Sequence, residues 1–138
     1  LMTHLARCCQ PIPGDLIKGY ITQGRGISVH RADCEQLSEL SLHAPERIID
    51  TVWGNGFVGS YILTLRVEAL ERNGLLKDIT SLFSNEKISV TTMKSRIDYK
   101  RQLSVMDFDL EVTNIEILSR VTSRVEQIKD VMSVKRLG

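Results

Sequence analysis

Hydrophobic and polar residues alternate in several short segments of this 138-residue chain. In the first half, alternation or short apolar runs predict strands over Asp15–Thr22, Ile27–Val29 and Ile48–Trp53. The residues Gln23–Gly26 are typical of a hairpin turn, because glycine reaches positive φ angles without steric cost. Apolar residues at helical spacing predict a helix over Arg31–Leu40, and Pro45 prevents that helix from continuing.

The second half alternates strands with helices. Strands are predicted over Tyr61–Ala69, Ile88–Ile97, Met106–Val112 and Val131–Leu137. Apolar residues at helical spacing predict helices over Leu75–Phe83 and Ile117–Ile128, with Asn114 as the cap of the second helix. A change in the alternation near Met93 indicates a β-bulge. The resulting βαββαβ order is that of a ferredoxin-like sandwich, with helices on one face of a four-stranded sheet.

A glycine-rich stretch separates the two halves. Residues 54–59, G-N-G-F-V-G, interrupt the pattern and mark a domain boundary. We therefore expect a small domain over residues 1–54, a linker over 55–60 and a second domain over 61–138. The predicted fold class is α+β, a ββαβ domain followed by a βαββαβ domain.

The charge balance limits the partners of the chain. Eighteen basic and 17 acidic residues give a net charge of +1, so no overall field attracts the chain to nucleic acid or to an anionic membrane. Any such binding must use a local patch. No apolar run approaches the length of a transmembrane helix, so we expect a soluble globular chain. We also expect it to be cytoplasmic and to have no membrane partner.

All three cysteines and one histidine occur in a pattern that predicts a metal site: Cys8, Cys9, His30 and Cys34. Thiolate and imidazole are the ligands that Zn²⁺ prefers, and four of them close a tetrahedral structural site. His30 and Cys34 share one face if their segment is helical, whereas adjacent cysteines converge only where the backbone turns sharply. The alternative is that the cysteines are small buried hydrophobes, while their odd number disfavours a disulfide framework.

Longer stretches of the chain resemble a known family. Residues 8–15, C-C-Q-P-I-P-G-D, and 19–34, G-Y-I-T-Q-G-R-G-I-S-V-H-R-A-D-C, resemble the zinc-finger domain of long RelA/SpoT-type (p)ppGpp synthetases. Residues 71–76, E-R-N-G-L-L, resemble the first turn and helix of the ACT domain that ends those proteins. Gln10 and the run from Tyr20 to Gly26 look more like the ribosome-associated branch, the GTP pyrophosphokinases, than the hydrolase-dominated branch.

This resemblance implies a C-terminal regulatory region of an enzyme of the stringent response. Such enzymes transfer pyrophosphate from ATP to the 3′-hydroxyl of GTP or GDP. Catalysis is expected outside this chain, which has no G-x4-G-K-[ST] motif to cradle a triphosphate. The resemblance also implies a zinc ion on the four residues above, and a partner, the large-subunit RNA of the ribosome.

Two further sets of residues are expected to bind partners. For RNA we expect Arg25 at the hairpin tip, supported by Lys18 and Arg31, because a guanidinium can bond phosphate or stack on a base. ACT domains often form homodimers and bind small amino acids near the first βα turn, and the corresponding residues are Asn73, Gly74, Leu75 and Leu76. The family motif usually opens with Asp, and Glu71 stands there instead.

Three classes of function therefore remain open. The first is an RNA-contacting regulatory module, the second is an amino-acid-sensing ACT dimer, and the third is an independent RNA-recognition domain. RNA-recognition domains share the βαββαβ order, but their sheets stack bases on aromatic side chains. Residues 103–108, L-S-V-M-D-F, carry one aromatic residue and an acid, which disfavours the third class.

Overall fold

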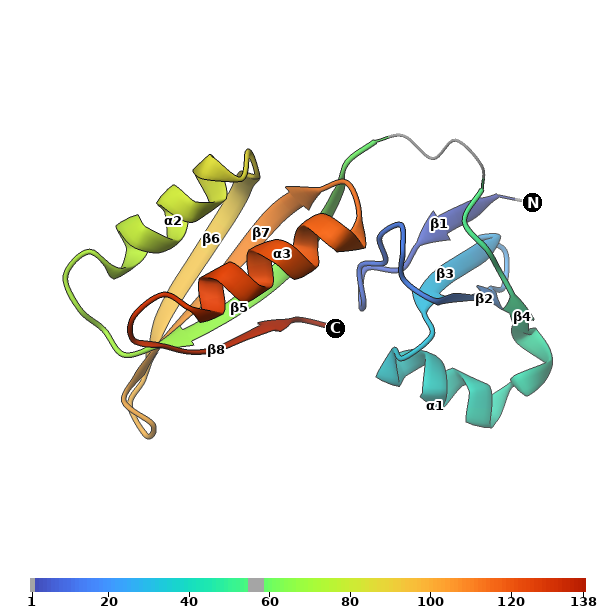
Figure 1. Ribbon diagram of the computed structural model, residues 1–138. Coiled ribbons are helices and arrows are strands. Elements are labelled where there is room, and N and C mark those ends of the chain that lie inside the picture. Colours follow the sequence, from blue (N-terminus) through green and yellow to red (C-terminus); the bar gives the residue numbers. More distant parts are fainter. Residues whose placement is uncertain (1, 55–58) are drawn as a thin grey trace. The chain divides into compact units, whose positions relative to one another are not determined.

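The chain divides into two compact units, and the division falls between Gly59 and Ser60. The computed structural model describes residues 2–54 and 59–138, and Figure 1 shows the strands and helices of each unit. The predicted linker, residues 55–60, contains this division, and its residues 55–58 lie outside the described part of the chain. None of the described helices is long and apolar enough to cross a membrane.

The first unit is built on a four-stranded sheet in the order β1-β3-β2-β4. Its elements are β1 (Thr3–Leu5), β2 (Ile17–Ile21), β3 (Ile27–Arg31), helix α1 (Glu35–His43), a 3₁₀ helix (Pro45–Arg47) and β4 (Ile48–Asp50). Strand β2 runs antiparallel to β3 and β4, whereas β1 runs parallel to β3. The α+β class is confirmed, and the structure adds one strand, β1, to the predicted ββαβ order.

The sequence pattern does not predict β1, because its three residues are exposed and too few to show alternation. Backbone hydrogen bonds hold the strand in place. The Ile27 amide donates to the Met2 carbonyl (2.8 Å), and the Ala6 amide donates to the Val29 carbonyl (2.8 Å). Gly26 permits this close approach, because its φ is +75° and a Cβ atom there would collide with the Met2 oxygen.

The predicted helix over Arg31–Leu40 is wrong at its start, because β3 continues through Arg31. Helix α1 begins only after Cys34, which is its N-cap residue. His30 therefore lies on a strand and Cys34 at a helix start, so the expectation that both share a helical face is wrong. Pairing of β3 with β2 overrides the helical spacing of the sequence.

The predicted hairpin between β2 and β3 is present. Ile21 pairs with Ile27, and the amide and hydroxyl of Thr22 both donate to the Gly26 carbonyl (2.9 and 2.7 Å). The Arg25 amide donates in turn to the Thr22 hydroxyl oxygen (3.1 Å). These bonds fix the backbone of the hairpin tip and leave the side chain of Arg25 exposed.

The second unit has an antiparallel sheet in the order β6-β7-β5-β8 and follows the predicted βαββαβ order. Its elements are β5 (Tyr61–Ala69), α2 (Leu75–Asn85), β6 (Ser89–Asp98), β7 (Leu103–Val112), α3 (Ile115–Glu126) and β8 (Val131–Arg136). Asn114 caps α3 as predicted, because its side-chain oxygen accepts a hydrogen bond from the Ile117 amide (3.0 Å). The bulge in β6 lies between Val90 and Thr92, slightly before the predicted place near Met93.

The core of the second unit lies between its two helices and one face of the sheet (Figure 1). Its buried side chains include Leu63, Leu65 and Val67 on β5, Ile79 and Phe83 on α2, Phe108 and Leu110 on β7, and Val121 and Val125 on α3. Phe83 meets Phe108 edge to face, with ring centroids 5.1 Å apart. Such a pair adds about 0.5–1.5 kcal/mol beyond the area that it buries.

The opposite face of this sheet is polar, and its charges pair across strands. Arg66 on β5 donates two hydrogen bonds to the Asp107 carboxylate on β7 (2.7 and 2.8 Å). Glu68 is only 7% exposed and accepts hydrogen bonds from Arg101 and from the Ser133 hydroxyl (3.0 Å). The hydrogen bond from Arg101 is the main reason that the pKa of Glu68 falls to about 2, so the buried carboxylate stays ionised.

Replacing Arg101 by alanine should lower the free energy of unfolding of the second unit at neutral pH, because the buried Glu68 carboxylate would lose its cationic partner and keep the Ser133 hydroxyl alone. The pKa of Glu68 is lower in the folded chain than its ordinary value of 4.5. The stabilisation is therefore present in full above about pH 4.5 and is lost as the pH falls towards 2. The difference between wild type and Arg101→Ala should shrink over this interval.

Urea unfolding followed by NMR measures this effect, because it resolves the signals of each unit in the whole chain. Lys100→Ala removes an exposed cation from the same turn and is the matched control, which should leave the stability unchanged. An Arg101→Ala penalty of constant size from neutral pH to the acid end of the interval would contradict this role of Arg101.

Candidate metal centre

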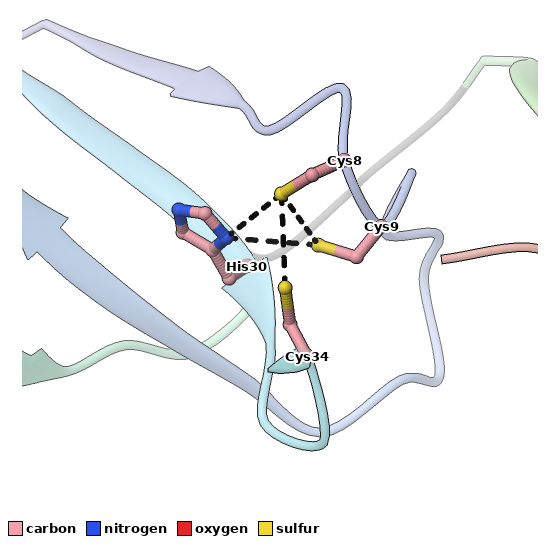
Figure 2. A group of neighbouring side chains, drawn as sticks. All are labelled: Cys8, Cys9, His30 and Cys34. Carbon is pink, nitrogen blue, oxygen red and sulfur yellow. Dashed lines mark hydrogen bonds between the residues drawn. The ribbon is translucent and has the colours of Figure 1, made fainter. Parts of the chain in front are cut away.

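Three segments of the first unit bring four predicted ligands together, Cys8, Cys9, His30 and Cys34 (Figure 2). The two cysteines of the vicinal pair lie in the turn after β1, His30 lies on β3, and Cys34 is the N-cap of α1. The turn closes through a hydrogen bond from the Gln10 amide to the Ala6 carbonyl (3.1 Å), with Gln10 at a φ of +49°. The sharp turn that the vicinal pair requires is therefore present, just before Pro11 and Pro13.

The ligand atoms of these residues all lie within 4.8 Å of one another. Cys8 Sγ is 3.4 Å from His30 Nδ1 and 3.6 Å from Cys34 Sγ. Cys9 Sγ is 4.0 Å from Cys8 Sγ and 3.8 Å from His30 Nδ1. All three cysteines are free thiols. Four donors at this spacing could hold one metal ion.

The same side chains form much of the core of the first unit. Its buried cluster consists of Ala6, Cys9, Cys34 and Leu37, with Cys8, Tyr20 and Ile48 packed against it. His30 is only 5% exposed, and Cys9 is fully enclosed. Because alanine and cysteine side chains bury little apolar area, packing alone stabilises this unit only modestly.

Two hydrogen bonds orient the donor atoms. The Arg31 amide donates to Cys9 Sγ (3.3 Å), and Ser28 Oγ lies 3.0 Å from His30 Nε2. Figure 2 shows the His30 ring with Nδ1 towards the sulfurs, so a ring that binds a cation through Nδ1 would carry its proton on Nε2 and donate it to Ser28. Sequence reasoning missed Ser28, although residues two apart on a strand share one face and the spacing S-x-H was visible.

Burial controls the protonation of the cluster. It raises the pKa of Cys9 to about 12 and raises the pKa of Cys8, where the nearby Cys34 adds to the effect. Burial lowers the pKa of His30, and the proximity of His4 lowers it further. Without a cation, the Cys8 and Cys9 thiols and the His30 imidazole are therefore neutral at neutral pH. A bound divalent cation would displace the thiol protons.

The three cations predicted to contact RNA differ in their surroundings. Lys18 on β2 forms an ion pair with Asp50 (3.0 Å), and the mostly buried Arg31 lies 3.6 Å from Asp33. The exposed side chain of Arg25 forms no hydrogen bond or ion pair with any residue in the described ranges. Of the three, Arg25 is thus the one that can bind a partner without breaking an ion pair.

The predicted effector turn lies in the second unit, between β5 and α2. Gly74 is the N-cap of α2 at a φ of +80°, Leu75 belongs to the core, and Leu76 is exposed. The guanidinium of Arg72 also crosses this turn and donates to the carbonyl of the exposed Asn73 (3.0 Å). Binding of a small amino acid here, and homodimerisation through this unit, stay predictions.

Comparisons with known proteins match both units. The family model of the RelA/SpoT RIS domain matches residues 1–54, and that of an ACT domain matches residues 58–136. The GTP pyrophosphokinases of Photobacterium angustum and Escherichia coli (strain K12) are 69% and 56% identical over 137 residues. The bifunctional (p)ppGpp synthase/hydrolase RelA of Mycobacterium tuberculosis is 36% identical over 142 residues. Each alignment covers 99% of this chain and 18% of the relative, so the chain spans about a fifth of their length.

A solved structure shows a similar fold. The crystal structure of the ACT domain from the GTP pyrophosphokinase of Chlorobium tepidum covers 57% of this chain and 100% of its own, with a TM-score of 0.50 and 18% identity. At this identity the likeness concerns the fold alone. From the two family matches and the close relatives, residues 1–54 are a RelA/SpoT RIS domain, residues 58–136 are an ACT domain, and the chain belongs to the RelA/SpoT family.

Proposed function

We propose that this chain is the regulatory C-terminal region of a (p)ppGpp synthetase, in which the RIS domain contacts ribosomal RNA and the catalytic domains lie elsewhere in the protein. The observation that carries the proposal is the cluster of three cysteines and one histidine within the RIS domain. The matched GTP pyrophosphokinases are much longer than this chain, which leaves room for catalysis outside it.

The spacing of the cluster fits a structural zinc ion. With Zn–S of about 2.3 Å and Zn–N of about 2.05 Å, tetrahedral coordination gives about 3.8 Å between sulfurs and about 3.6 Å between sulfur and nitrogen. The separations in this chain are 3.6 and 4.0 Å for two sulfur pairs, and 3.4 and 3.8 Å from sulfur to Nδ1. Four protein ligands leave no open position, so zinc here would stabilise the fold and take no part in catalysis.

Contact with RNA would depend on a few placed cations, because the net charge is only +1. Arg25 is the best placed, since hydrogen bonds fix the backbone of the hairpin tip and its guanidinium is exposed. A guanidinium can donate two parallel bonds to a phosphate or stack on an unpaired base. Lys18 and Arg31 rank below it, because each would first have to leave a carboxylate partner.

An amino-acid sensor in the ACT domain is less well supported. Arg72 spans the turn that would receive the ligand, and its guanidinium pairs with Asp78 (2.8 Å) and Asp130 (3.2 Å). The same guanidinium donates to the backbone carbonyl of Asn73 in the turn and to that of Lys129 before β8. The carboxylate of an entering amino acid would therefore compete with two carboxylates of the chain itself.

The chain should bind one zinc ion, and chelation should loosen the first unit selectively. Structural zinc contributes apparent binding free energies of about 10–16 kcal/mol, more than a unit of this size gains by packing. Amide hydrogen exchange with and without a strong chelator measures the effect. After chelation, residues 2–54 should exchange faster, and residues 59–138 should exchange at the same rate.

Two histidine variants provide the control for this experiment. His30→Ala should lose the ion, whereas His43→Ala, which changes an exposed histidine of the same unit, should retain it. Elemental analysis gives the stoichiometry. Unchanged protection of residues 2–54 after complete removal of zinc would contradict a structural role for the ion.

Arg25→Ala should weaken binding to the large ribosomal subunit. If one phosphate contact is lost, the plot of log affinity against log salt concentration should become shallower by about 0.7–0.9. Arg25→Lys should show an intermediate affinity, because an ammonium group keeps the charge but cannot form the bidentate bond. Co-sedimentation at several salt concentrations measures both quantities.

Lys77→Ala is the matched control, because it removes an exposed cation from α2 in the other unit. It should change neither affinity nor slope, and zinc content should be verified in every variant. Wild-type affinity and slope in Arg25→Ala would show that the hairpin tip is not an RNA contact.

The chain on its own should make no (p)ppGpp from ATP and GTP, because the proposed catalysis lies outside it. Thin-layer chromatography of radiolabelled nucleotides measures the product, with a full-length GTP pyrophosphokinase as the positive control. Synthesis by the purified chain above the enzyme-free background would overturn its assignment as a purely regulatory region.

A further inference from the structure

An open groove of about 720 Å³ lies on the first unit beside the metal centre. Its polar lining consists of His4, Arg7, Arg25, Ser28, His30 and Gln36. These residues come from β1, the turn after it, the hairpin tip, β3 and α1. Sequence reasoning does not group His4 and Arg7 with the others, because the sequence pattern does not predict β1.

The parallel pairing of β1 with β3 assembles this groove. His4 on β1 lies opposite Ser28 on β3 in the strand register. Arg7 follows β1 directly, at the start of the turn that carries the cysteine pair. Arg25 stands just before β3, in a hairpin tip whose backbone is fixed by hydrogen bonds. Three separate segments therefore place their cationic or polar side chains around one hollow.

The positive charge of the groove is not neutralised by its own lining. No carboxylate belongs to that lining, and no residue of the described ranges forms a hydrogen bond or ion pair with the side chains of His4, Arg7 or Arg25. Other arginines of the chain are paired with carboxylates, among them Arg31, Arg66, Arg72, Arg101, Arg120 and Arg124. Cations gathered without a counter-charge favour an anionic partner.

The Ser28 hydroxyl gives the groove a hydrogen-bond donor besides its two arginines. When Nδ1 of His30 faces the sulfurs, Nε2–H donates to Ser28 Oγ, and the hydroxyl proton of Ser28 is left to donate in its turn. Ser28 is only 8% exposed, and a hydrogen bond that is shielded from water is stronger. The groove thus combines guanidinium charge with a hydroxyl donor held by the metal-site histidine.

We propose that this groove binds the phosphate backbone of an RNA strand, with Arg7 and Arg25 contacting phosphates and His4 and Ser28 donating hydrogen bonds. Its size, and the separation of its two arginines on different segments, suit a run of phosphates better than a single ion. The inference rests on the proposed RNA-contacting function. It extends the contact from the hairpin tip to β1 and to the turn beside the cysteines.

Binding of the zinc-loaded chain to purified large ribosomal subunits tests this inference. Arg7→Ala and His4→Ala should each weaken the affinity severalfold, and Arg7→Ala should also flatten the salt slope by about 0.7–0.9. His43→Ala and Lys77→Ala change exposed side chains outside the groove and should bind like the wild type. Inorganic phosphate at constant ionic strength should not displace the subunit.

The outcomes separate this inference from the proposed function. Wild-type affinity and slope in both Arg7→Ala and His4→Ala would overturn the groove and leave the RNA-contacting function in place. Absence of binding by the wild type would overturn both. Displacement by inorganic phosphate would assign the groove to a free anion and overturn the RNA assignment. Arg7 adjoins Cys8, so Arg7→Ala could lose zinc. In that case the affinity of His4→Ala, on β1, tests the groove: weaker binding supports it, and wild-type binding contradicts it.

Discussion

The first unit depends on the convergence of four side chains from three segments. Cys8 and Cys9 come from the turn after β1, His30 from β3 and Cys34 from the start of α1. Cysteine and alanine contribute much of its small buried cluster. The second unit has no such need, because two amphipathic helices cover its sheet and large side chains such as Phe83 and Phe108 pack in its core. A metal ion would thus give the first unit the stability that the second unit gains by burying apolar area.

The same convergence links the metal centre to the proposed RNA contact. Arg7 adjoins the first cysteine, Ser28 contacts the candidate ligand His30, and the strand that carries Ser28 also pairs with β1 and His4. Loosening the cluster would therefore disperse the cations of the groove as well as the core. Zinc in this unit would act on function by positioning residues, because its coordination leaves no site for a substrate.

Much of the fold could be predicted from local patterns. Alternation and helical spacing define the βαββαβ order of the second unit, and Asn114 marks the start of α3 by its capping chemistry. The four candidate ligands followed from residue type, because cysteine and histidine are rare in this chain and each has a clear chemical preference. Local patterns failed where long-range pairing decides the structure. Strand β1 forms because it pairs with β3 and because Gly26 leaves room for its backbone. Pairing with β2 extends β3 through Arg31, where helical spacing predicted a helix.

The most direct test of a zinc-closed first unit is X-ray absorption at the zinc edge of the purified chain. If Cys8, Cys9, His30 and Cys34 all bind the ion, the spectrum should show three sulfur neighbours at about 2.3 Å and one nitrogen at about 2.0–2.1 Å. A shell of oxygen and nitrogen alone, or one with fewer than three sulfurs, would contradict the arrangement on which the first unit depends.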